Sequence, residues 1–127
     1  MLSSATPMGF LLVTDRPRAR AFYEDVLSLS FVAEDDFALV LRSGPIHLRL
    51  TTMDSFSAAD HTVFGWQVTN IETAVEALTA KGVAFERYPF FGDAQGENGI
   101  WSAPGGDRVA WFRDPDGNLL SLSQHVA

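Results

Sequence analysis

The sequence predicts an α+β fold built from two repeated modules, each with the order strand, helix, strand, strand, strand. In both halves an apolar run is followed by a helix-capping residue and an amphipathic helix, and the caps Asp15 and Asn70 lie about 55 residues apart. The strands that end at Arg42 and Arg113 lie about 71 residues apart by the same comparison. The second module therefore carries roughly 16 additional residues, an excess that usually marks a functional or mobile loop.

The first module covers about residues 7–52. Residues 8–14 form an apolar run that indicates a buried strand. Asp15 can accept hydrogen bonds from the free N–H groups of the following helix, and Pro17 suits the first helical turn because its missing donor costs little there. The helix has one apolar face, formed by Ala19, Phe22, Tyr23, Val26 and Leu27. Three short strands follow, at residues 31–34, 37–42 and 46–51.

Residues 53–60 are small and polar apart from Phe56 and are predicted to link the modules, while the chain as a whole, 1–127, is interpreted as a single domain. The second module covers about residues 61–125. Its predicted elements are a strand at 61–68, a helix at 71–81 and further strands at 83–87, 108–113 and 118–124.

The additional residues of the second module fall between Arg87 and Arg108. Residues 89–107 contain five glycines and a candidate short strand at 100–102. Because glycines permit hinge-like backbone changes, we expect this segment to be a mobile lid that carries Trp101 over a cavity.

Side chains alternate along strands, which separates a helix-facing side from an open, concave side in each module. On the last strand, Leu120 and Leu122 are placed beneath the helix, as are Phe64 and Trp66 on the second module's first strand. The positions predicted on the open sides are Met8, Phe10, Leu12, His47 and Arg49 in the first module, and Val63, Gly65, Gln67, Leu119, Ser121 and Ser123 in the second.

The composition limits the function classes. With 46% hydrophobic and 20% charged residues, the chain can bury a core and is not expected to be disordered. The absence of cysteine removes disulfides and thiolate chemistry and fits a reducing compartment. We find no signal-peptide pattern and no apolar stretch of bilayer length, so we expect a cytoplasmic protein without a membrane partner. A net charge of −7 disfavours binding to nucleic acid.

Three features together resemble the vicinal oxygen chelate superfamily: the duplicated βαβββ order, residues 15–27 with Phe22-Tyr23 before Val26-Leu27, and the sequence Phe112-Arg113-Asp114-Pro115-Asp116-Gly117-Asn118-Leu119-Leu120. This superfamily includes glyoxalase I, fosfomycin-resistance enzymes, extradiol dioxygenases and bleomycin-binding proteins. The resemblance covers nearly the whole chain. It implies two curved mixed sheets, each with a helix on its outer face.

The resemblance also implies metal-ligand positions, and this chain does not carry metal ligands at them. Metal-using members place histidine, glutamine or glutamate where this sequence has Met8, Val63 and Ser121. A divalent metal needs three or four converging N/O ligands, so these side chains predict no metal and no other cofactor. The alternative is a displaced site formed by His61, His47 and a carboxylate, with His125 also able to swing in.

The aromatic side chains favour a small-molecule ligand. Large flat rings stack on planar ligands, although they can equally fill a core or a dimer seam. By the resemblance, the face that carries Trp111 lines the substrate cavity in fosfomycin-resistance enzymes. The predicted ligand-binding residues are Met8, Phe10, Leu12, His47, Arg49, Val63, Gln67, Trp101, Trp111 and Ser121.

Three functions fit these observations. The first is metal-free sequestration of an aromatic or apolar molecule in the concave sheet, as in bleomycin-binding relatives. The second is a small lyase, isomerase or dioxygenase-like enzyme that uses His47 as a general base with Arg49 as oxyanion partner, or a displaced metal. The third is a protein-interaction module. No Ser-x-x-Lys or Gly-x-Ser-x-Gly motif is present. We expect a homodimer, because a short module leaves a sheet edge and an apolar concave face to be covered.

Overall fold

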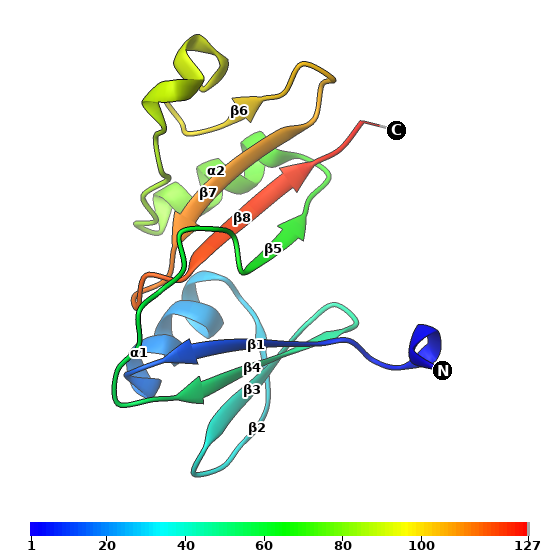
Figure 1. Ribbon diagram of the computed structural model, residues 1–127, viewed down its shortest axis with the longest axis vertical. Helices are drawn as coiled ribbons and strands as arrows, with labels where there is room; N and C mark the ends of the chain where they lie inside the picture. Colours follow the sequence, from blue (N-terminus) through cyan, green and yellow to red (C-terminus); the bar gives the residue numbers. More distant parts are fainter. Residues whose placement is uncertain (127) are drawn as a thin grey trace. The chain divides into compact units, whose positions relative to one another are not determined.

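The computed structural model describes residues 1–126 and divides into two compact units, Met1–Ala58 and Ala59–Ala127 (Figure 1). The boundary falls inside residues 53–60, the segment predicted to link the modules. Each unit contains one four-stranded mixed sheet with helical segments, so the chain is an α+β protein, as predicted. Within residues 1–126, every helix is too short or too polar to cross a membrane.

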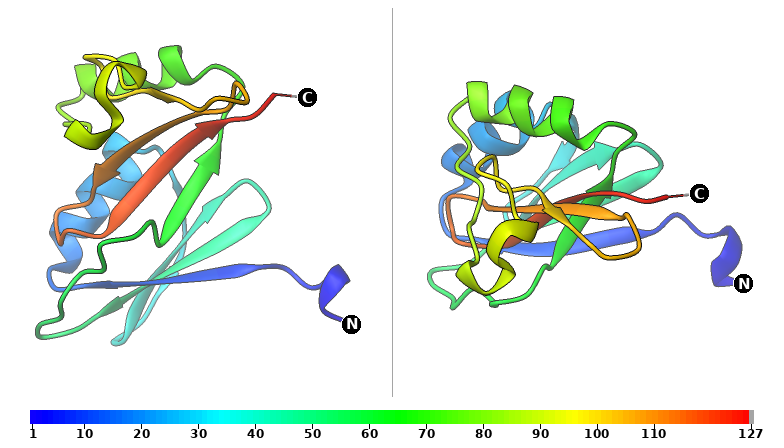
Figure 2. Two further views of the ribbon diagram at one scale, coloured as in Figure 1. Left: turned by 45° about the horizontal axis from the view of Figure 1, so that its top comes forward. Right: turned by 90° about the horizontal axis from the view of Figure 1, so that it is seen from above.

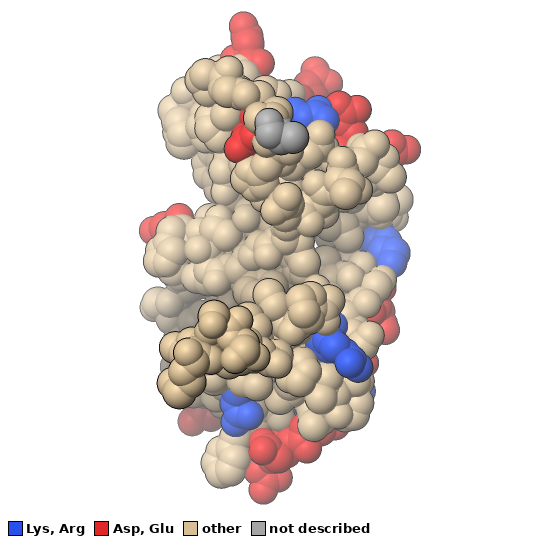
Figure 3. All heavy atoms as spheres, turned by 90° about the vertical axis from the view of Figure 1, so that its right-hand side faces the viewer, with Lys and Arg blue, Asp and Glu red and all other residues tan. Residues whose placement is uncertain are grey.

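The surface carries the excess of acidic groups that the net charge of −7 requires. On the face shown in Figure 3, the basic side chains are separated from one another by uncharged or acidic surface.

The first unit contains sheet 1, in which the strand order is β1-β4-β3-β2. Strand β1 runs parallel to β4, whereas β4 with β3 and β3 with β2 form antiparallel pairs. The elements are η1 (Leu2–Ser4), β1 (Met8–Val13), α1 (Arg16–Arg20), η2 (Ala21–Val26), β2 (Ser30–Glu34), β3 (Ala38–Ser43) and β4 (Ile46–Thr52). This order confirms the predicted arrangement of the first module.

The predicted first helix forms as α1 and continues as a π-helical stretch, η2. Asp15 caps it as predicted, because its carboxylate accepts a hydrogen bond from the Arg18 N–H at 3.0 Å. Ala19 and Tyr23 are buried, which identifies the side of the helix that packs toward the sheet. The aliphatic core of this unit includes Leu11, Val13, Leu39, Leu41, Leu48 and Leu50.

The second unit contains sheet 2, with the strand order β5-β8-β7-β6 and the same pattern of one parallel and two antiparallel pairs. Its elements are β5 (Phe64–Gln67), α2 (Ile71–Ala80), η3 (Pro89–Ala94), β6 (Trp101–Ser102), β7 (Arg108–Arg113) and β8 (Leu119–Gln124). The Asn70 side chain caps α2 as predicted, accepting from the Thr73 N–H at 3.1 Å. Helix α2 packs on β7 and β8 (Figure 2).

The helix-facing side of sheet 2 is aromatic, whereas that of sheet 1 is aliphatic. The rings of Phe64 and Trp66 meet edge to face at 5.1 Å, and Trp66 stacks on the buried Phe112 at 6.4 Å. Phe85 adds an edge contact with Phe112 at 5.4 Å. Phe64 pairs with the buried Leu120, so these rings lie on the side predicted to face the helix.

The turn between β7 and β8 is held by a buried carboxylate. Asp114 Oδ1 accepts hydrogen bonds from the N–H groups of Asp116 and Asn118, both at 2.9 Å. Asp114 Oδ2 accepts from the Asn118 side-chain amide at 2.8 Å. Gly117 has a φ of 89°, a conformation that glycine adopts readily. The turn motif seen in the sequence thus has a direct hydrogen-bonding cause.

In the second unit, two of the observed segments differ from the strands predicted by the sequence. Residues 61–63 lie outside β5, and residues 83–87 form no strand. Phe85 makes only an isolated bridge with Phe112, and β6, within the segment expected to be a lid, supplies the fourth strand. The reason is that the chain leaves the edge of β7 beyond this bridge and returns to it at Trp101.

Candidate functional site

The open face of sheet 2, the side opposite α2, brings four of the predicted ligand-binding residues together. One row across β6, β7, β8 and β5 consists of Trp101, Val109, Ser123 and Gln67. The neighbouring row across β7, β8 and β5 consists of Trp111, Ser121 and Gly65. Gly65 and Gln67 are exposed and the others are half-buried, so solvent reaches this face.

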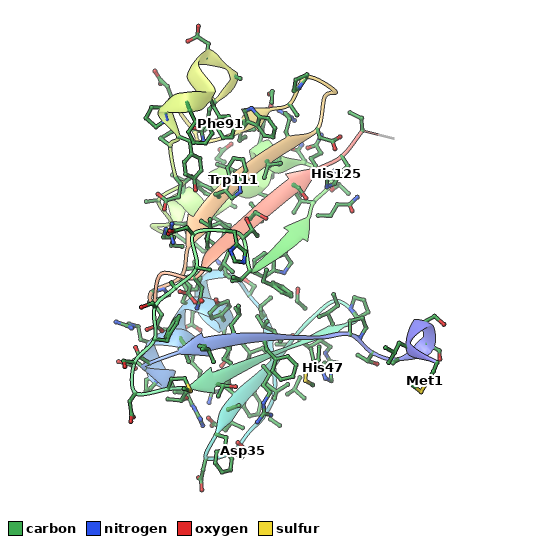
Figure 4. All side chains as sticks on the ribbon, in the orientation of Figure 1. Met1, Asp35, His47, Phe91, Trp111 and His125 are labelled. Carbon is green, nitrogen blue, oxygen red and sulfur yellow. The ribbon has the colours of Figure 1, made fainter. Side chains whose placement is uncertain are left out.

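Five rings gather over the β7–β6 side of this face, and Figure 4 labels two of them, Phe91 and Trp111. We call them the aromatic cluster: Tyr88, Phe90, Phe91, Trp101 and Trp111. The Phe91 ring stacks on Trp101 at 4.7 Å and on Trp111 at 5.6 Å, with interplanar angles of 17° and 18°. The two indoles lie 6.1 Å apart, so the structure does bring together the tryptophans singled out from the sequence.

The aromatic cluster owes its position to an excursion of the edge strand, which we define as residues 88–100. Phe85 pairs with Phe112 and Trp101 pairs with Val109, so the chain advances 16 residues (85 to 101) while β7 advances three (112 to 109). The excursion therefore adds 13 residues (16 minus 3) to an otherwise continuous antiparallel strand. Most of the excess predicted for the second module is located here.

The side chain of Gln95 ties the excursion to its own ends. Its Oε1 accepts from the Tyr88 N–H at 2.7 Å, and its Nε2 donates to the carbonyls of Glu86 and Gly99, both at 2.9 Å. Gln95 is buried, so losing these bonds would leave polar groups unpaired away from water. Gly99 packs closely, since a Cβ there would lie 2.7 Å from the Cβ of Phe85.

Trp101 lies in the short strand that the sequence analysis placed at residues 100–102, at the end of the segment expected to be a lid. Trp101 belongs to β6 and pairs with Val109, so its ring is held at the sheet edge. The backbone before it is fixed by Gln95. The ring that covers both indoles is Phe91, which the protein itself supplies from η3.

Five other predicted residues lie together on the open face of sheet 1. Register pairs Met8 with His47 and Phe10 with Arg49, and Leu12 shares this side of β1. Met8, Phe10 and Leu12 are 44%, 66% and 38% exposed. This face therefore presents apolar side chains to solvent beside an imidazole and a guanidinium; Figure 4 labels His47.

The surroundings of His47 and Arg49 do not favour acid–base catalysis. Within residues 1–126, neither side chain makes a hydrogen bond or an ion pair. An activated general base is usually oriented by a third group that bonds its far nitrogen, and His47 has none there.

The residues at the family's metal positions do not fit a divalent metal. Val63 precedes β5 and Ser121 lies on the open face of sheet 2, whereas Met8 begins β1 in the first unit. Their side chains offer no set of N/O ligands. In the part of the chain that the structure describes, no three His, Asp or Glu side chains gather so that they could hold a metal ion. His61, a residue of the alternative displaced site, is exposed in the segment before β5.

Gly65 leaves no side chain in the middle of the open face of sheet 2. A Cβ at this position would lie 2.5 Å from Ser121 Oγ and 3.0 Å from the Ser121 carbonyl oxygen. The Ser121 hydroxyl has no hydrogen-bond partner among the described residues. A small residue with an available hydroxyl therefore lies directly beside Trp111.

A chain of hydrogen bonds that the sequence analysis missed lies beside the row of Ser123. The Ser123 hydroxyl is 2.9 Å from His125 Nε2, and His125 Nδ1 is 2.8 Å from Asp107 Oδ2. The other Asp107 oxygen accepts from the Val126 N–H at 2.9 Å. This N–H, and then the His125 ring, hold the pKa of Asp107 below its usual value. His125, which the alternative metal site would have used, bonds Asp107 and Ser123 here.

The signal for this arrangement was present in the sequence. Ser123 and His125 are two residues apart, which places them on one side of an extended chain. The register pairs Arg108 with Gln124, so Asp107 comes opposite His125 across the β7–β8 pair. Only the pairing register, which no local pattern reveals, brings the three together.

The repeated strand order and the open sheet face in each unit define a duplicated α+β protein of the βαβββ type. Residues 6–122 match the model of the Glyoxalase/Bleomycin resistance protein/Dioxygenase superfamily, and the chain belongs to this superfamily. This finding confirms the resemblance drawn from the helix segment and the Asp114 turn. A search of curated proteins found no match to the sequence.

Solved structures share the fold over nearly the whole chain. The glyoxalase family protein from Enterococcus faecalis is 20% identical with a TM-score of 0.76, and the match covers 97% of this chain and 99% of that one. Lactoylglutathione lyase from Agrobacterium tumefaciens is 20% identical with a TM-score of 0.73, covering 95% and 93%. A superfamily member from Sphaerobacter thermophilus DSM 20745 is 20% identical with a TM-score of 0.75, covering 98% and 100%. At this identity the likeness establishes the fold.

Proposed function

We propose that this protein binds a small planar molecule, aromatic or apolar, on the open face of sheet 2 without a metal. The observation that carries the proposal is the aromatic cluster standing beside the small residues Gly65 and Ser121. A flat ligand laid over these small residues meets the side of Trp111. Rings of this size give a large contact area at little cost in conformational entropy.

Polar groups on the same face would orient the ligand. Gln67, Ser121 and Ser123 offer an amide and two hydroxyls in adjacent positions, which fits the few convergent polar groups of a typical small-molecule site. Arg113, at the end of β7, is paired with Glu86 at 2.7 Å. Because Glu86 already neutralises this guanidinium, the proposal favours a ligand without a strong charge.

We extend the proposal to a cytoplasmic homodimer. The open face of sheet 1 supports it, because Met8, Phe10 and Leu12 form an exposed apolar row that association would cover. A second copy of the chain is the partner we favour, since most soluble oligomers are symmetric homo-oligomers. Light scattering at micromolar concentration tests this part, and a monomer would contradict it.

The binding proposal is tested by titrating aromatic compounds and antibiotics against the tryptophan fluorescence of protein purified without chelator, with metal analysis of the same sample. Trp111→Leu should weaken binding of any compound found by about 1–3 kcal/mol, the scale of a lost aromatic contact. Stoichiometric metal that is lost when His61 or His47 is replaced would contradict the metal-free part.

Trp66→Phe is the matched control, because Trp66 lies on the opposite side of the same sheet. It removes one indole from the fluorescence signal and should leave affinity unchanged. Equal affinities for wild type and Trp111→Leu, with a loss in Trp66→Phe, would place the ligand elsewhere.

A further inference from the structure

The hydrogen-bonded chain Asp107–His125–Ser123 has the connectivity of a nucleophilic triad. In such triads a carboxylate bonds Nδ1 of a histidine, and Nε2 of that histidine bonds the hydroxyl of the nucleophile. Here the two contacts are 2.8 Å and 2.9 Å and use the same ring nitrogens. Triads of this kind recur on unrelated folds and are recognised by geometry rather than by order in the sequence.

The tautomer follows from the donors and acceptors available. The ionised Asp107 carboxylate can only accept, so the neutral His125 ring carries its proton on Nδ1. Nε2 is then the acceptor, and the Ser123 hydroxyl donates to it. The Val126 N–H holds the second carboxylate oxygen and fixes the orientation of Asp107.

The surroundings of Ser123 supply an open face for a substrate, a hydrogen-bond donor for an oxyanion and access for water. Ser123 lies in the row that contains Trp101 and Gln67, on the open face of sheet 2. The Gln67 amide sits on the adjacent strand, where it can donate to an oxyanion formed on a carbonyl attached to Ser123. Asp107 and His125 are 40% and 46% exposed, so water reaches the histidine.

We propose that Ser123 is a nucleophile that accepts the acyl group of small aryl esters and releases it by hydrolysis. Ser123 Oγ attacks the ester carbonyl while its proton passes to His125 Nε2. The bond from the carbonyl carbon to the aryl oxygen breaks, and the phenol leaves with that proton. Water then attacks the acyl carbon and gives a proton to Nε2. The bond from the acyl carbon to Ser123 Oγ breaks, Oγ takes that proton from Nε2, and the carboxylic acid departs. No oxidant or cofactor enters the step.

This activity goes beyond ligand binding and does not depend on the aromatic cluster for compact substrates. The first test treats the purified protein with diisopropyl fluorophosphate, whose reaction with serine needs no aromatic contact. We expect one phosphoryl group per chain, located at Ser123 by peptide mass mapping. No label, or a label on another residue, overturns the proposal even if an aromatic ligand binds.

The second test follows the release of nitrophenolate from p-nitrophenyl acetate. We expect turnover to disappear in Ser123→Ala and to fall about 10²–10⁴-fold in His125→Ala, the usual contribution of a general base. Added imidazole should restore part of the His125→Ala rate and none of the Ser123→Ala rate. Unchanged turnover in Ser123→Ala, or absence of imidazole rescue, overturns the assignment.

Ser102→Ala is the control, because Ser102 is exposed and pairs with Arg108 rather than with the row of Ser123. It should keep both labelling and turnover. A circular dichroism melt of each variant shows whether it is folded, and the mapping of the wild-type label needs no variant at all. Failure of aromatic ligands to bind, with labelling intact, would contradict the binding proposal alone.

Discussion

The two units share one backbone plan and differ in what they place on it. In both units the first strand in the sequence lies at one edge of the sheet and runs parallel to the last strand. In both, a side-chain oxygen caps the helix by accepting a hydrogen bond from the N–H three residues further along the chain. In sheet 1 the edge strand β2 runs along β3 with a single irregularity. In sheet 2 the corresponding edge is interrupted by the excursion.

The open faces differ at matching register positions. The row Val40–Arg49–Phe10 of sheet 1 corresponds to the row Trp111–Ser121–Gly65 of sheet 2. Sheet 1 carries long side chains on β1 and β4, whereas sheet 2 carries small ones on β5 and β8 and a large ring on β7. The comparison teaches that a repeated scaffold is specialised by side-chain size at fixed positions and by insertion at an edge, without a change in strand order.

The largest expected effect concerns the turn between the last two strands of each unit. Asp114→Ala should lower the free energy of unfolding by about 2–4 kcal/mol, because three hydrogen bonds to a buried carboxylate are lost. Pro45→Ala, in the corresponding turn of the first unit, should cost under about 0.5 kcal/mol, as is usual for exposed positions. Urea unfolding measures both, and equal losses would contradict the distinction.

The next largest effect concerns the stability of the excursion, compared with that of the edge strand β2 in the first unit. Gln95→Ala should cost about 1–3 kcal/mol, because the carbonyls of Glu86, which is half-buried, and of Gly99, which is buried, lose their donor. Gln95→Glu keeps the acceptor for Tyr88 but turns a carboxylate toward those carbonyls, so it should cost at least as much. Hydrogen exchange should show new exposure confined to residues 85–101; faster exchange in β2 instead would refute the account.

Exchanging the central residue of the open face tests the size difference directly. Gly65→Ala should cost about 1–3 kcal/mol because its Cβ meets Ser121 Oγ and the Ser121 carbonyl. In a Ser121→Ala background the cost should fall, since one of the two contacts is removed. Additive losses in this double-mutant cycle would show that the close approach carries no energy.

The helix caps are where the units should behave alike. Asp15→Ala and Asn70→Ala each remove one acceptor for a first-turn N–H, at 3.0 Å and 3.1 Å. Each should cost about 1 kcal/mol in thermal or urea unfolding. If the two losses in unfolding free energy differed by more than twofold, the two helix caps would not be equivalent.

The smallest effect is a pH dependence with one carboxylate in each unit. The N–H groups of Phe37 and Ala38 lower the pKa of Asp35, and the Val126 N–H followed by His125 lowers the pKa of Asp107. A lowered folded-state pKa gives stability that is present above the unfolded value, about 3.9 for Asp, and is lost as the pH falls through the folded value. NMR titration should place both groups below that value, and Asp35→Asn or Asp107→Asn should flatten the acid limb of stability.

Local patterns were sufficient for most of the fold. The caps Asp15 and Asn70, the helix-facing Phe64 and Trp66, and the turn at Asp114 each follow from nearest-neighbour hydrogen bonding or from side-chain alternation. The excess length of the second module was also visible in the spacing of the repeats.

The remaining features depend on contacts between distant residues. The pairing of Trp101 with Val109 decides which strand the short segment at 100–102 joins. The hydrogen bonds of Gln95 decide that the two ends of the excursion are held together. The contact of Asp107 with His125 depends on the β7–β8 register. Neither periodicity nor turn chemistry carries that information, because a pairing partner is set by the whole sheet.

The excursion also has an evolutionary consequence. Its two ends meet neighbouring positions along β7, so removing residues 88–100 would join Arg87 to Trp101 in register and restore an unbroken strand. Loop-closure cost rises slowly with length, so segments of other lengths could be exchanged at this junction at small energetic cost. The segment at this junction can therefore change in length and sequence while the sheet that carries it keeps its register.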